Sequence, residues 1–378
     1  MGHDIRFVDL KAQYRRLEEE IGARMQQVLE HGQFIMGPEV PEFEAALAAF
    51  AGAKHAVGVA NGTDALHIAL MAEEIGPGDA VFLPSFTFTA TAEVVLHCHA
   101  TPVFCDVDPT TFNLDLEDLE RKVDAVVAAG KLTPRAVIAV DLFGLPVDYA
   151  ALAEIAARFD LFVLGDAAQS YGAECGDRKV GALAPVTATS FFPAKPLGCY
   201  GDGGALLTDD GSRADIFRSI RAHGKGTAKY DITRIGLNSR LDTLQAAVLI
   251  PKLGIFSDEL EKRRRVAAMY TDRIDDIART PLRDSNTLKS AWAQYSILVD
   301  RRDDIASRLK EHGVPTAIYY PKPMHLQPAY RHFGEGEGSL PISERLSDEV
   351  LCLPMHPYLD TETVDKICDL IRSSLQSD

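Results

Sequence analysis

Residues 190–204 read SFFPAKPLGCYGDGG and place one lysine, Lys195, between a pair of aromatic residues and a glycine-rich turn. Glycine lets the backbone bend sharply and approach a ligand closely. An amine in a partly apolar pocket has its charged form disfavoured, so its pKa falls and it can attack a carbonyl to form an imine. Lys195 is therefore a candidate imine-forming amine. A solvated lysine on a surface loop is the alternative.

The chain has 378 residues, 46% of them hydrophobic, which is enough for a large core and predicts a division into two domains. We place the boundary between residues 1–250 and 251–378. A formal net charge of −16 argues against binding to nucleic acid or to an anionic membrane, because each requires a basic face.

The cysteines indicate a reducing compartment. All six are scattered without a C-x-x-C pair, as expected of reduced thiols rather than a disulfide framework or a zinc site. Adjacent residues such as His97, Cys98 and His99 do not converge on one ion, so no metal is expected there. The sequence shows neither a signal segment nor an apolar run long enough to span a bilayer, so we expect a cytoplasmic protein with no membrane partner.

The apolar pattern predicts an α/β fold. Helical spacing indicates helices over residues 13–31 and 39–50. Beyond them, short apolar runs alternate with helical segments, as in a mainly parallel sheet flanked by helices. The predicted strands are residues 56–60, 80–83, 101–105, 136–140, 161–164, 188–192 and 205–208.

The remaining chain predicts a smaller α+β domain. Its elements are charged helical sequence at 257–279, an apolar segment at 292–299, helical sequence at 303–313 and a final helix at 361–375. Ligands of parallel sheets bind outside the carboxyl ends of the strands, so we expect the site in the larger domain.

The first strand-end motif is residues 61–66, NGTDAL, which opens a helix after an apolar run. Helix-start N–H groups, Gly62 and the Thr63 hydroxyl together suit a phosphate. The motif is not a Walker loop, because the Gly-Lys-Thr/Ser ending is missing. An ordinary Asn or Thr helix cap is the alternative.

The second motif, residues 84–91, contains Phe88, which could lie against a flat ring or simply pack in the core. The third is Asp166, which ends the strongly apolar run 161–164 and is costly to bury unless paired. A protonated pyridine nitrogen would pair with it and make the ring an electron sink, and Gln169 could reach the phenolic oxygen of that ring. The alternative for Asp166 is a helix cap.

Ser190 completes the set as a further phosphate donor beside Lys195. Phosphate cradle, stacking aromatic, strand-end acid and imine-forming lysine in this chain order describe a pyridoxal 5′-phosphate site.

The sequence resembles, essentially from end to end, the DegT/DnrJ/EryC1/StrS group of fold-type I aminotransferases that act on nucleotide-linked keto sugars. The resemblance lies in residues 32–40 (GQFIMGPEV), 61–66, 165–170 (GDAAQS), 190–195 and 238–247 (NSRLDTLQAA). It implies that Lys195 holds pyridoxal phosphate as an imine, that Asp166 contacts the pyridine nitrogen, that Gln169 lies near the phenolic oxygen and that Phe88 stacks on the ring. Gly62, Thr63 and Ser190 would bind the phosphate, joined by Asn238 from the other subunit of a homodimer.

Within this group, the sequence most resembles the enzymes that aminate C3 of UDP-2-acetamido-2-deoxy-3-oxo-glucuronate for bacterial surface polysaccharide (O-antigen). This resemblance lies in residues 191–204, 238–245, 320–328 and 353–358. Arg240 could bind the sugar carboxylate bidentately, or it could orient the loop that carries Asn238. Tyr319, Tyr320 and His325 are further expected substrate contacts, although the resemblance leads us to expect histidine at position 319.

Glutamate is the amino donor that the resemblance implies. Relatives that remove a sugar hydroxyl carry histidine at the lysine position, so Lys195 favours transamination. The alternatives are an aminotransferase for a dTDP- or UDP-linked 3- or 4-keto-deoxyhexose, a pyridoxal phosphate-dependent sugar dehydratase and a non-catalytic regulatory relative. A nicotinamide dehydrogenase is disfavoured, because the early strand–helix turn lacks G-x-G-x-x-G.

Overall fold

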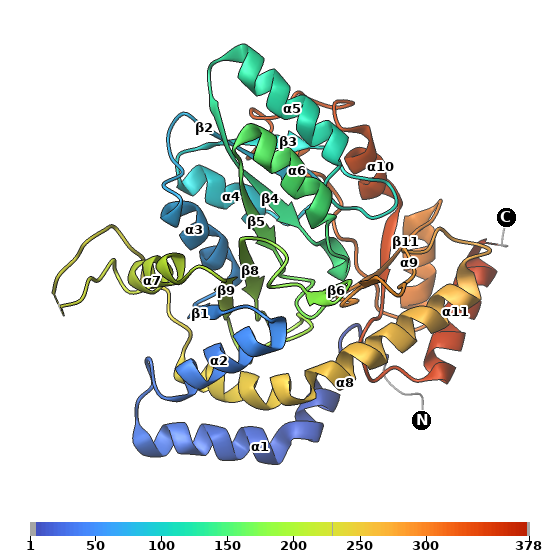
Figure 1. Cartoon of the computed structure of the whole chain (residues 1–378). Coiled ribbons are helices and arrows are strands. Elements are labelled where there is room, and N and C mark those ends of the chain that lie inside the picture. The colour runs from blue at the N-terminus through green and yellow to red at the C-terminus, as the bar shows by residue number, and fades with distance from the viewer. Residues whose placement is uncertain (1–4, 229, 376–378) are drawn as a thin grey trace.

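A seven-stranded sheet lies at the centre of the larger part of the molecule (Figure 1). The computed structural model describes residues 5–228 and 230–375. Its sheet has the order β1-β9-β8-β5-β4-β2-β3. The strands are β1 (His55–Val59), β2 (Asp79–Pro84), β3 (Thr101–Cys105), β4 (Thr133–Val140), β5 (Phe162–Asp166), β8 (Val186–Ser190) and β9 (Gly204–Thr208). Each corresponds to one of the predicted apolar runs, so the predicted mainly parallel sheet is confirmed.

One strand runs against the others. β9 pairs antiparallel with both β1 and β8, whereas β2–β3, β2–β4, β4–β5 and β5–β8 are parallel pairs. A parallel neighbour needs a crossover, usually a helix, but residues 191–203 between β8 and β9 form a loop without one, so the chain returns antiparallel. The stretch that contains Lys195 is therefore the connection between two adjacent strands.

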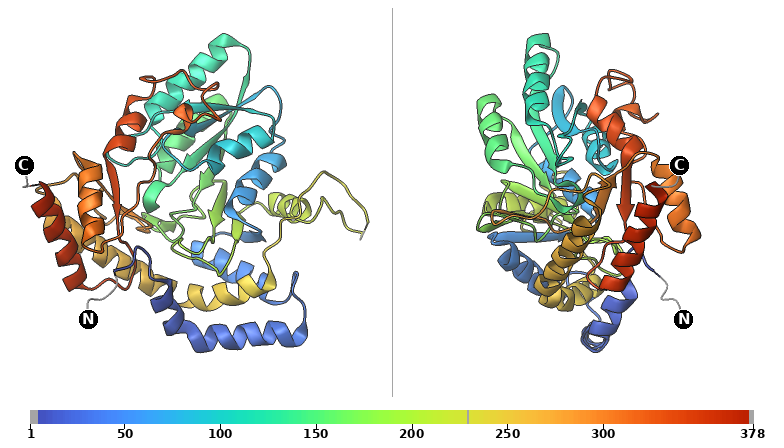
Figure 2. Two further views of the ribbon diagram at one scale, coloured as in Figure 1. Left: turned by 180° about the vertical axis from the view of Figure 1, so that it is seen from behind. Right: turned by 90° about the vertical axis from the view of Figure 1, so that its right-hand side faces the viewer.

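Helices cover both faces of the sheet (Figures 1 and 2). On one face, α3 (Gly62–Ala72), α4 (Ala90–His97) and α7 (Gly211–Ile220) bury residues such as Ile68 and Phe217 against the strands. The opposite face is covered by α2 (Glu39–Ala51), α5 (Leu116–Ala129), α6 (Tyr149–Phe159) and the start of α8. This three-layer packing buries both faces of the sheet, which explains why its strands read as continuous apolar runs.

The long helix α8 (Thr243–Ile274) joins the two parts of the molecule. Its first half packs on α1 (Leu10–His31) and α2, and its second half packs on α11 (Thr361–Leu375). The helix begins well before the predicted 257–279 segment and continues through Pro251. Proline usually breaks a helix, so local sequence does not indicate this continuity. The predicted boundary at 250/251 lies inside α8, and the two-domain division stays a prediction.

A second apolar cluster lies around a small sheet at the far end of α8. β11 (Tyr295–Leu298) and β12 (Val350–Leu353) pair antiparallel, and Tyr270 and Ile367 pack beside them, with the Tyr270 ring 4.9 Å from that of Tyr295. The remaining elements of the later part of the chain are β10 (Leu288–Lys289), which belongs to a separate three-stranded sheet, α9 (Arg302–Glu311), η2 (Met324–Leu326) and α10 (Pro341–Glu349). The chain also forms three short elements: η1 (Leu142–Gly144) after β4, and β6 (Glu174–Cys175) and β7 (Arg178–Lys179), which form a sheet with β10. In the described chain, no helix combines the length and apolar character needed to cross a membrane.

Candidate active site

Gly62, in the motif of residues 61–66, lies against Ser190, the last residue of β8, at the carboxyl edge of the sheet. A Cβ placed on Gly62 would lie 2.7 Å from Ser190 Cβ and 3.2 Å from Ser190 Oγ. The space between them therefore exists only because residue 62 has no side chain. The side chain of Asn61 caps α3 by accepting from Asp64 N at 2.7 Å, so the helix-cap alternative is also correct. The N–H groups of Gly62 and Thr63 are the first of α3, and the first N–H groups of a helix form an anion-binding site.

Lys195 lies in the β8–β9 connection, which short hydrogen bonds hold in place. Phe191 N donates to Gly203 O at 2.7 Å and Lys195 N donates to Phe192 O at 2.9 Å. Beneath this loop, the buried ammonium of Lys252 donates to Gly198 O at 2.6 Å. Burial lowers the pKa of Lys195, and the charge of Asp166 acts in the opposite direction. A neutral amine in such surroundings is the form that can attack a carbonyl.

Asp166 ends β5 with a buried carboxyl group that is 7% exposed. It accepts from Ala168 N at 3.1 Å and from Thr91 Oγ1 at 3.4 Å. The residues that follow form a turn rather than a helix, so the predicted helix-cap alternative for Asp166 is wrong. Burial raises the pKa of Asp166, while Lys195 and these two donors lower it. A carboxyl in this state would be stabilised by a cationic partner.

Gln169 lies between two parts of the chain. Its Oε1 accepts from Phe143 N at 2.6 Å, and its Nε2 donates to the hydroxyl of Tyr320 at 3.4 Å. The Tyr320 ring also lies 6.3 Å from that of Phe88, whose side chain is 55% exposed. Three predicted site residues from distant positions in the sequence are thus brought together.

Asn238 and Arg240 lie on a hairpin between α7 and α8, of which residues 221–228 and 230–242 are described. Asn238 is exposed and pairs with Ala222 across the hairpin, and Arg240 donates to Asn238 Oδ1. This contact is the one expected if Arg240 orients Asn238. A guanidinium has further donors that a carboxylate can use, so both predicted roles of Arg240 remain open.

The remaining predicted substrate residues occupy different surroundings. Tyr319 is half-buried, with its ring 6.3 Å from that of Phe7 and 5.8 Å from that of Tyr320. His325 is completely buried: its Nδ1 lies 2.7 Å from Ser85 Oγ and its Nε2 lies 3.1 Å from Glu344 Oε1. Both ring nitrogens are used by protein groups, so we propose that His325 holds the Ser85 end of the β2–α4 loop. Direct contact between His325 and substrate stays a prediction.

Several residues of the site were not assigned a role from the sequence. Thr91 Oγ1 donates to the Asp166 carboxyl, Lys252 Nζ donates to a carbonyl of the Lys195 loop, and the N–H of the buried Asp141 donates to Asp166 O. Asp141 follows an apolar strand as Asp166 does, so the same strand-end signal could have identified it. The roles of Thr91 and Lys252 depend on contacts between distant elements, which local sequence does not show.

These residues fit pyridoxal phosphate on structural grounds. The cradle at Gly62 and Ser190 would be filled by a single added Cβ, the Asp166 carboxyl is buried with its pKa raised, and the Lys195 amine has a lowered pKa. The phosphate, the ring nitrogen and the aldehyde of the cofactor each find a matching partner among them.

Comparison with known proteins also indicates a pyridoxal phosphate-dependent enzyme. Residues 15–372 match the model of the DegT/DnrJ/EryC1/StrS aminotransferase family. The chain belongs to this family. It is a pyridoxal phosphate-dependent aminotransferase of fold type I.

Individual members of the family are similar over their whole length. A UDP-2-acetamido-2-deoxy-3-oxo-D-glucuronate aminotransferase of Pseudomonas aeruginosa is 46% identical over 96% of this chain and 98% of its own. A crystal structure of a family aminotransferase from Brucella abortus is 50% identical, covers 98% of this chain and 99% of its own, and superposes with a TM-score of 0.96. S. venezuelae DesV in complex with a ketimine intermediate is 37% identical over 100% of both chains, with a TM-score of 0.94.

Proposed function

We propose that the protein transfers the amino group of glutamate to C3 of UDP-2-acetamido-2-deoxy-3-oxo-glucuronate, for the synthesis of a bacterial surface polysaccharide such as O-antigen. The observation that carries the chemistry is the charge interaction between the Lys195 amine, whose pKa burial lowers, and the carboxyl group of Asp166, which is buried at the end of β5. Support for the substrate comes from the likeness to the P. aeruginosa enzyme and from Arg240, whose guanidinium suits a sugar carboxylate.

Each residue has a distinct task in this reaction. When bound, pyridoxal phosphate withdraws electrons from the carbon that carries the transferred nitrogen, so that a proton on that carbon becomes acidic. The neutral Nζ of Lys195 takes that proton and returns one as general base and acid. The Asp166 carboxylate holds the pyridine nitrogen protonated. Gly62, Thr63 and Ser190 anchor the phosphate, Phe88 covers the ring and Gln169 donates to the phenolic oxygen.

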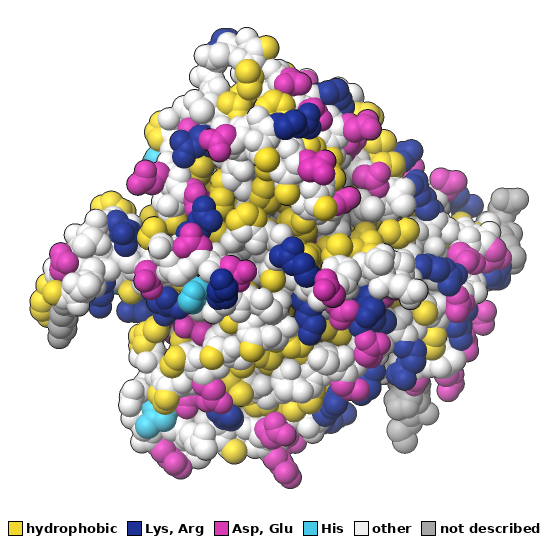
Figure 3. All heavy atoms as spheres, viewed as in Figure 1, with side chains coloured by type: hydrophobic (Ala, Val, Ile, Leu, Met, Phe, Trp, Pro, Cys, Tyr) yellow, Lys and Arg dark blue, Asp and Glu magenta, His cyan; other side chains and the backbone are white. Residues whose placement is uncertain are grey.

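The active protein is proposed to be a homodimer in which Asn238 enters the partner's site. The hairpin that carries Asn238 projects from the body of the molecule (Figures 1 and 2). Its apolar side chains are widely exposed, with Tyr230 at 85% and Ile235 at 84%. Figure 3 shows apolar atoms on the projecting segment. Exposed apolar patches mark protein–protein interaction sites. A cytoplasmic location also belongs to this proposal, on the strength of the sequence.

The experiment is a substrate comparison with the purified enzyme. Glutamate is mixed with the UDP-linked 3-keto-glucuronate or with a dTDP-linked 3- or 4-keto-deoxyhexose, and 2-oxoglutarate and the aminated sugar are quantified by mass spectrometry. We expect both products with the uronate and little with the uncharged sugars. Equal or faster turnover of a deoxyhexose would overturn the substrate assignment. Loss of water from the sugar without formation of 2-oxoglutarate would identify a dehydratase.

A further inference from the structure

Asp141, which the proposed reaction does not use, lies at the start of the turn that follows β4. Its side chain is 0% exposed. One carboxylate oxygen accepts from Val147 N at 2.8 Å, and the other accepts from Ser170 Oγ at 2.7 Å. Its own N–H donates to Asp166 O at 3.1 Å. Asp141 therefore closes the 141–147 turn and ties it to the segment that carries Gln169.

The same turn determines which end of the Gln169 amide faces the site. Phe143 N donates to Oε1 of Gln169 at 2.6 Å, and a backbone N–H can only donate. The amide oxygen is thereby held on the turn. The NH₂ group of Gln169 is directed the other way, toward the hydroxyl of Tyr320. A ligand beside Gln169 meets a hydrogen-bond donor, which suits a negatively charged oxygen.

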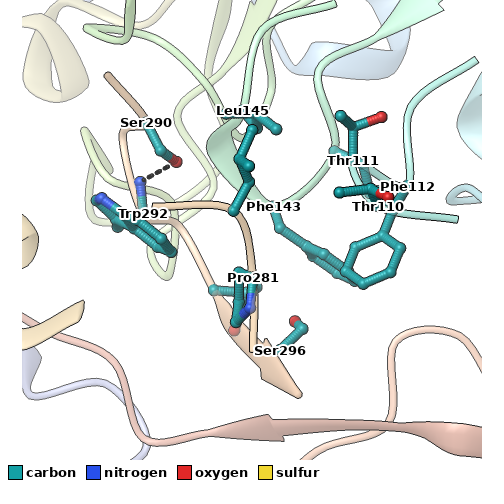
Figure 4. A pocket seen from close by; sticks show the side chains of 12 residues that line it. Thr110, Thr111, Phe112, Phe143, Leu145, Pro281, Ser290, Trp292 and Ser296 are labelled. Carbon is teal, nitrogen blue, oxygen red and sulfur yellow. Dashed lines mark hydrogen bonds between the residues drawn. The ribbon is translucent and has the colours of Figure 1, made fainter. Parts of the chain in front are cut away.

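The turn depends on its surroundings for its shape. Phe143 has φ 58°, in the left-handed region that a non-glycine residue adopts at a cost. Its ring packs against Phe112, with centroids 5.8 Å apart, and Figure 4 shows the two side chains beside a small cavity. That cavity, about 20 Å³, also borders Pro281 and Trp292 and is too small for a substrate. Behind the turn, Ala291 N donates to Gly144 O at 2.9 Å. These contacts support the turn on its other side, and Asp141 supports it on the side of the site.

We propose that Asp141 is a positioning residue: through Val147 N and Ser170 Oγ it holds the turn whose Phe143 N–H keeps the Gln169 amide with its donor end toward the cofactor's phenolic oxygen. This inference rests on the proposed function, because it takes pyridoxal phosphate as the group beside Gln169. The oxygen is an anion when the cofactor is bound as an imine, and a donor stabilises that anion and so lowers the affinity of the adjoining imine nitrogen for its proton. Losing the donor raises the pH at which the proton leaves.

The test measures the pH midpoint of the visible absorbance of the bound cofactor. Gln169→Leu sets the reference and is expected to raise the midpoint by ~1 pH unit, since it removes one hydrogen bond to a charged group. Asp141→Ala should raise it in the same direction by at least half as much. Asp141→Asn should keep the wild-type midpoint, because its amide can still accept from Val147 N and donate to the Ser170 hydroxyl. Asp148→Ala is the matched control, since Asp148 caps α6 on the same connection and is exposed.

A double variant distinguishes positioning from general damage. If Asp141 acts through Gln169, Asp141→Ala combined with Gln169→Leu has the midpoint of Gln169→Leu alone. An additive shift, or a wild-type midpoint in Asp141→Ala when Gln169→Leu is shifted, would overturn the inference and leave the proposed function intact. Failure of the wild-type protein to bind pyridoxal phosphate would overturn both.

If Asp141→Ala does not fold, Ser170→Ala supplies the answer, because it removes only the donor to Asp141. Its midpoint should rise, and a crystal structure of the holoprotein should show the Gln169 amide turned or displaced from Phe143 N. An unchanged midpoint together with an unchanged Phe143 N–Gln169 Oε1 contact would refute the positioning role.

Discussion

At the scale of single residues, burial sets the chemistry of the site. Burial raises the pKa of Asp166 and lowers the pKa of Lys195. The charge interaction between the two groups opposes both effects, because it lowers the pKa of Asp166 and raises that of Lys195. Asp166 is the last residue of β5 and pairs with Ala188, whereas Lys195 lies in the loop between β8 and β9, where its N–H donates to Phe192 O at 2.9 Å.

Substitution of Lys195 by alanine should abolish turnover and retain the fold. We expect the rate of 2-oxoglutarate formation to fall by roughly 10³-fold or more, because the base that moves the proton is lost. Pyridoxal phosphate should still bind through the phosphate cradle, which a fluorescence titration of the apoprotein measures. Transamination retained at the wild-type rate would exclude Lys195 as the catalytic amine.

Asp141 should make stability depend on pH. Burial is the main cause that raises its pKa from 3.8 to about 7, and the groups facing it are Ser170, Tyr149 and Asp166. The folded state therefore binds the Asp141 proton more tightly than the unfolded state, so the wild type loses stability as pH rises from about 4 to about 7, by at most ~4 kcal/mol. Asp141→Asn lacks this loss. Its unfolding free energy relative to wild type should increase across that window and stay level above it.

Urea unfolding of the apoproteins at several pH values measures this difference. Asp148→Asn, at an exposed position, is the control and should show no trend. A difference between Asp141→Asn and wild type that is constant from pH 4 to 8 would contradict the prediction.

Arg240 tests the recognition of the sugar. Arg240→Met should raise KM for the uronate by ~10-fold or more, since a hydrogen bond to a charged group contributes about 1.5–3 kcal/mol. KM for an uncharged keto sugar should change little. If Arg240 only orients Asn238, the affinity for pyridoxal phosphate will fall instead and both sugars will be affected alike.

At the scale of elements, the site is built where α3, β5 and β8 present their ends at one edge of the sheet. The antiparallel return of β9 gives the Lys195 loop two fixed ends, because Ser190 pairs with Gly204 in the ladder. α8 supports this loop from below through Lys252. The junction of α3 and β8 leaves no room for a side chain at residue 62.

Gly62→Ala should therefore close the phosphate cradle. The added Cβ would lie 2.7 Å from Ser190 Cβ, so one element must shift. We expect at least ~10-fold weaker binding of pyridoxal phosphate, equivalent to about 1.4 kcal/mol, measured by titration of the apoprotein. Gly254→Ala in α8 is the matched control, because a Cβ there has nothing within 4 Å. Unchanged cofactor affinity in Gly62→Ala would remove the cradle from the site.

At the scale of the whole molecule, the face in Figure 3 mixes charged and apolar side chains, and the projecting hairpin carries the most exposed large apolar side chains of the described residues, Tyr230 and Ile235. The hairpin exposes apolar side chains around the segment that carries Asn238. Within one chain, Asn238 contacts its own hairpin. The proposed role of Asn238 is in the site of a second copy of the chain.

Subunit complementation tests this arrangement. Lys195→Ala and Asn238→Ala proteins are each expected to have low activity, and a one-to-one mixture should recover about a quarter of the wild-type rate, because half of the dimers are mixed and each has one intact site. Lack of recovery, with mixed dimers verified by mass spectrometry, would place Asn238 in the site of its own subunit.

The sequence alone determined the strands of the main sheet, its mainly parallel character, the family and the residues at the strand ends. These follow from local patterns: a strand buried on both faces must be apolar, and a polar residue that ends it faces the ligand edge. It did not determine the antiparallel direction of β9, the passage of α8 through Pro251 or the burial of His325.

Nor did it show that Asp141, Thr91 and Lys252 support the site. Those features depend on contacts between residues far apart in the chain, such as Ser85 with His325 or Gly198 with Lys252. Tertiary packing brings such groups together. Their hydrogen-bond partners depend on how the helices and strands are arranged in space, and a contact between distant residues produces no periodic pattern in the sequence.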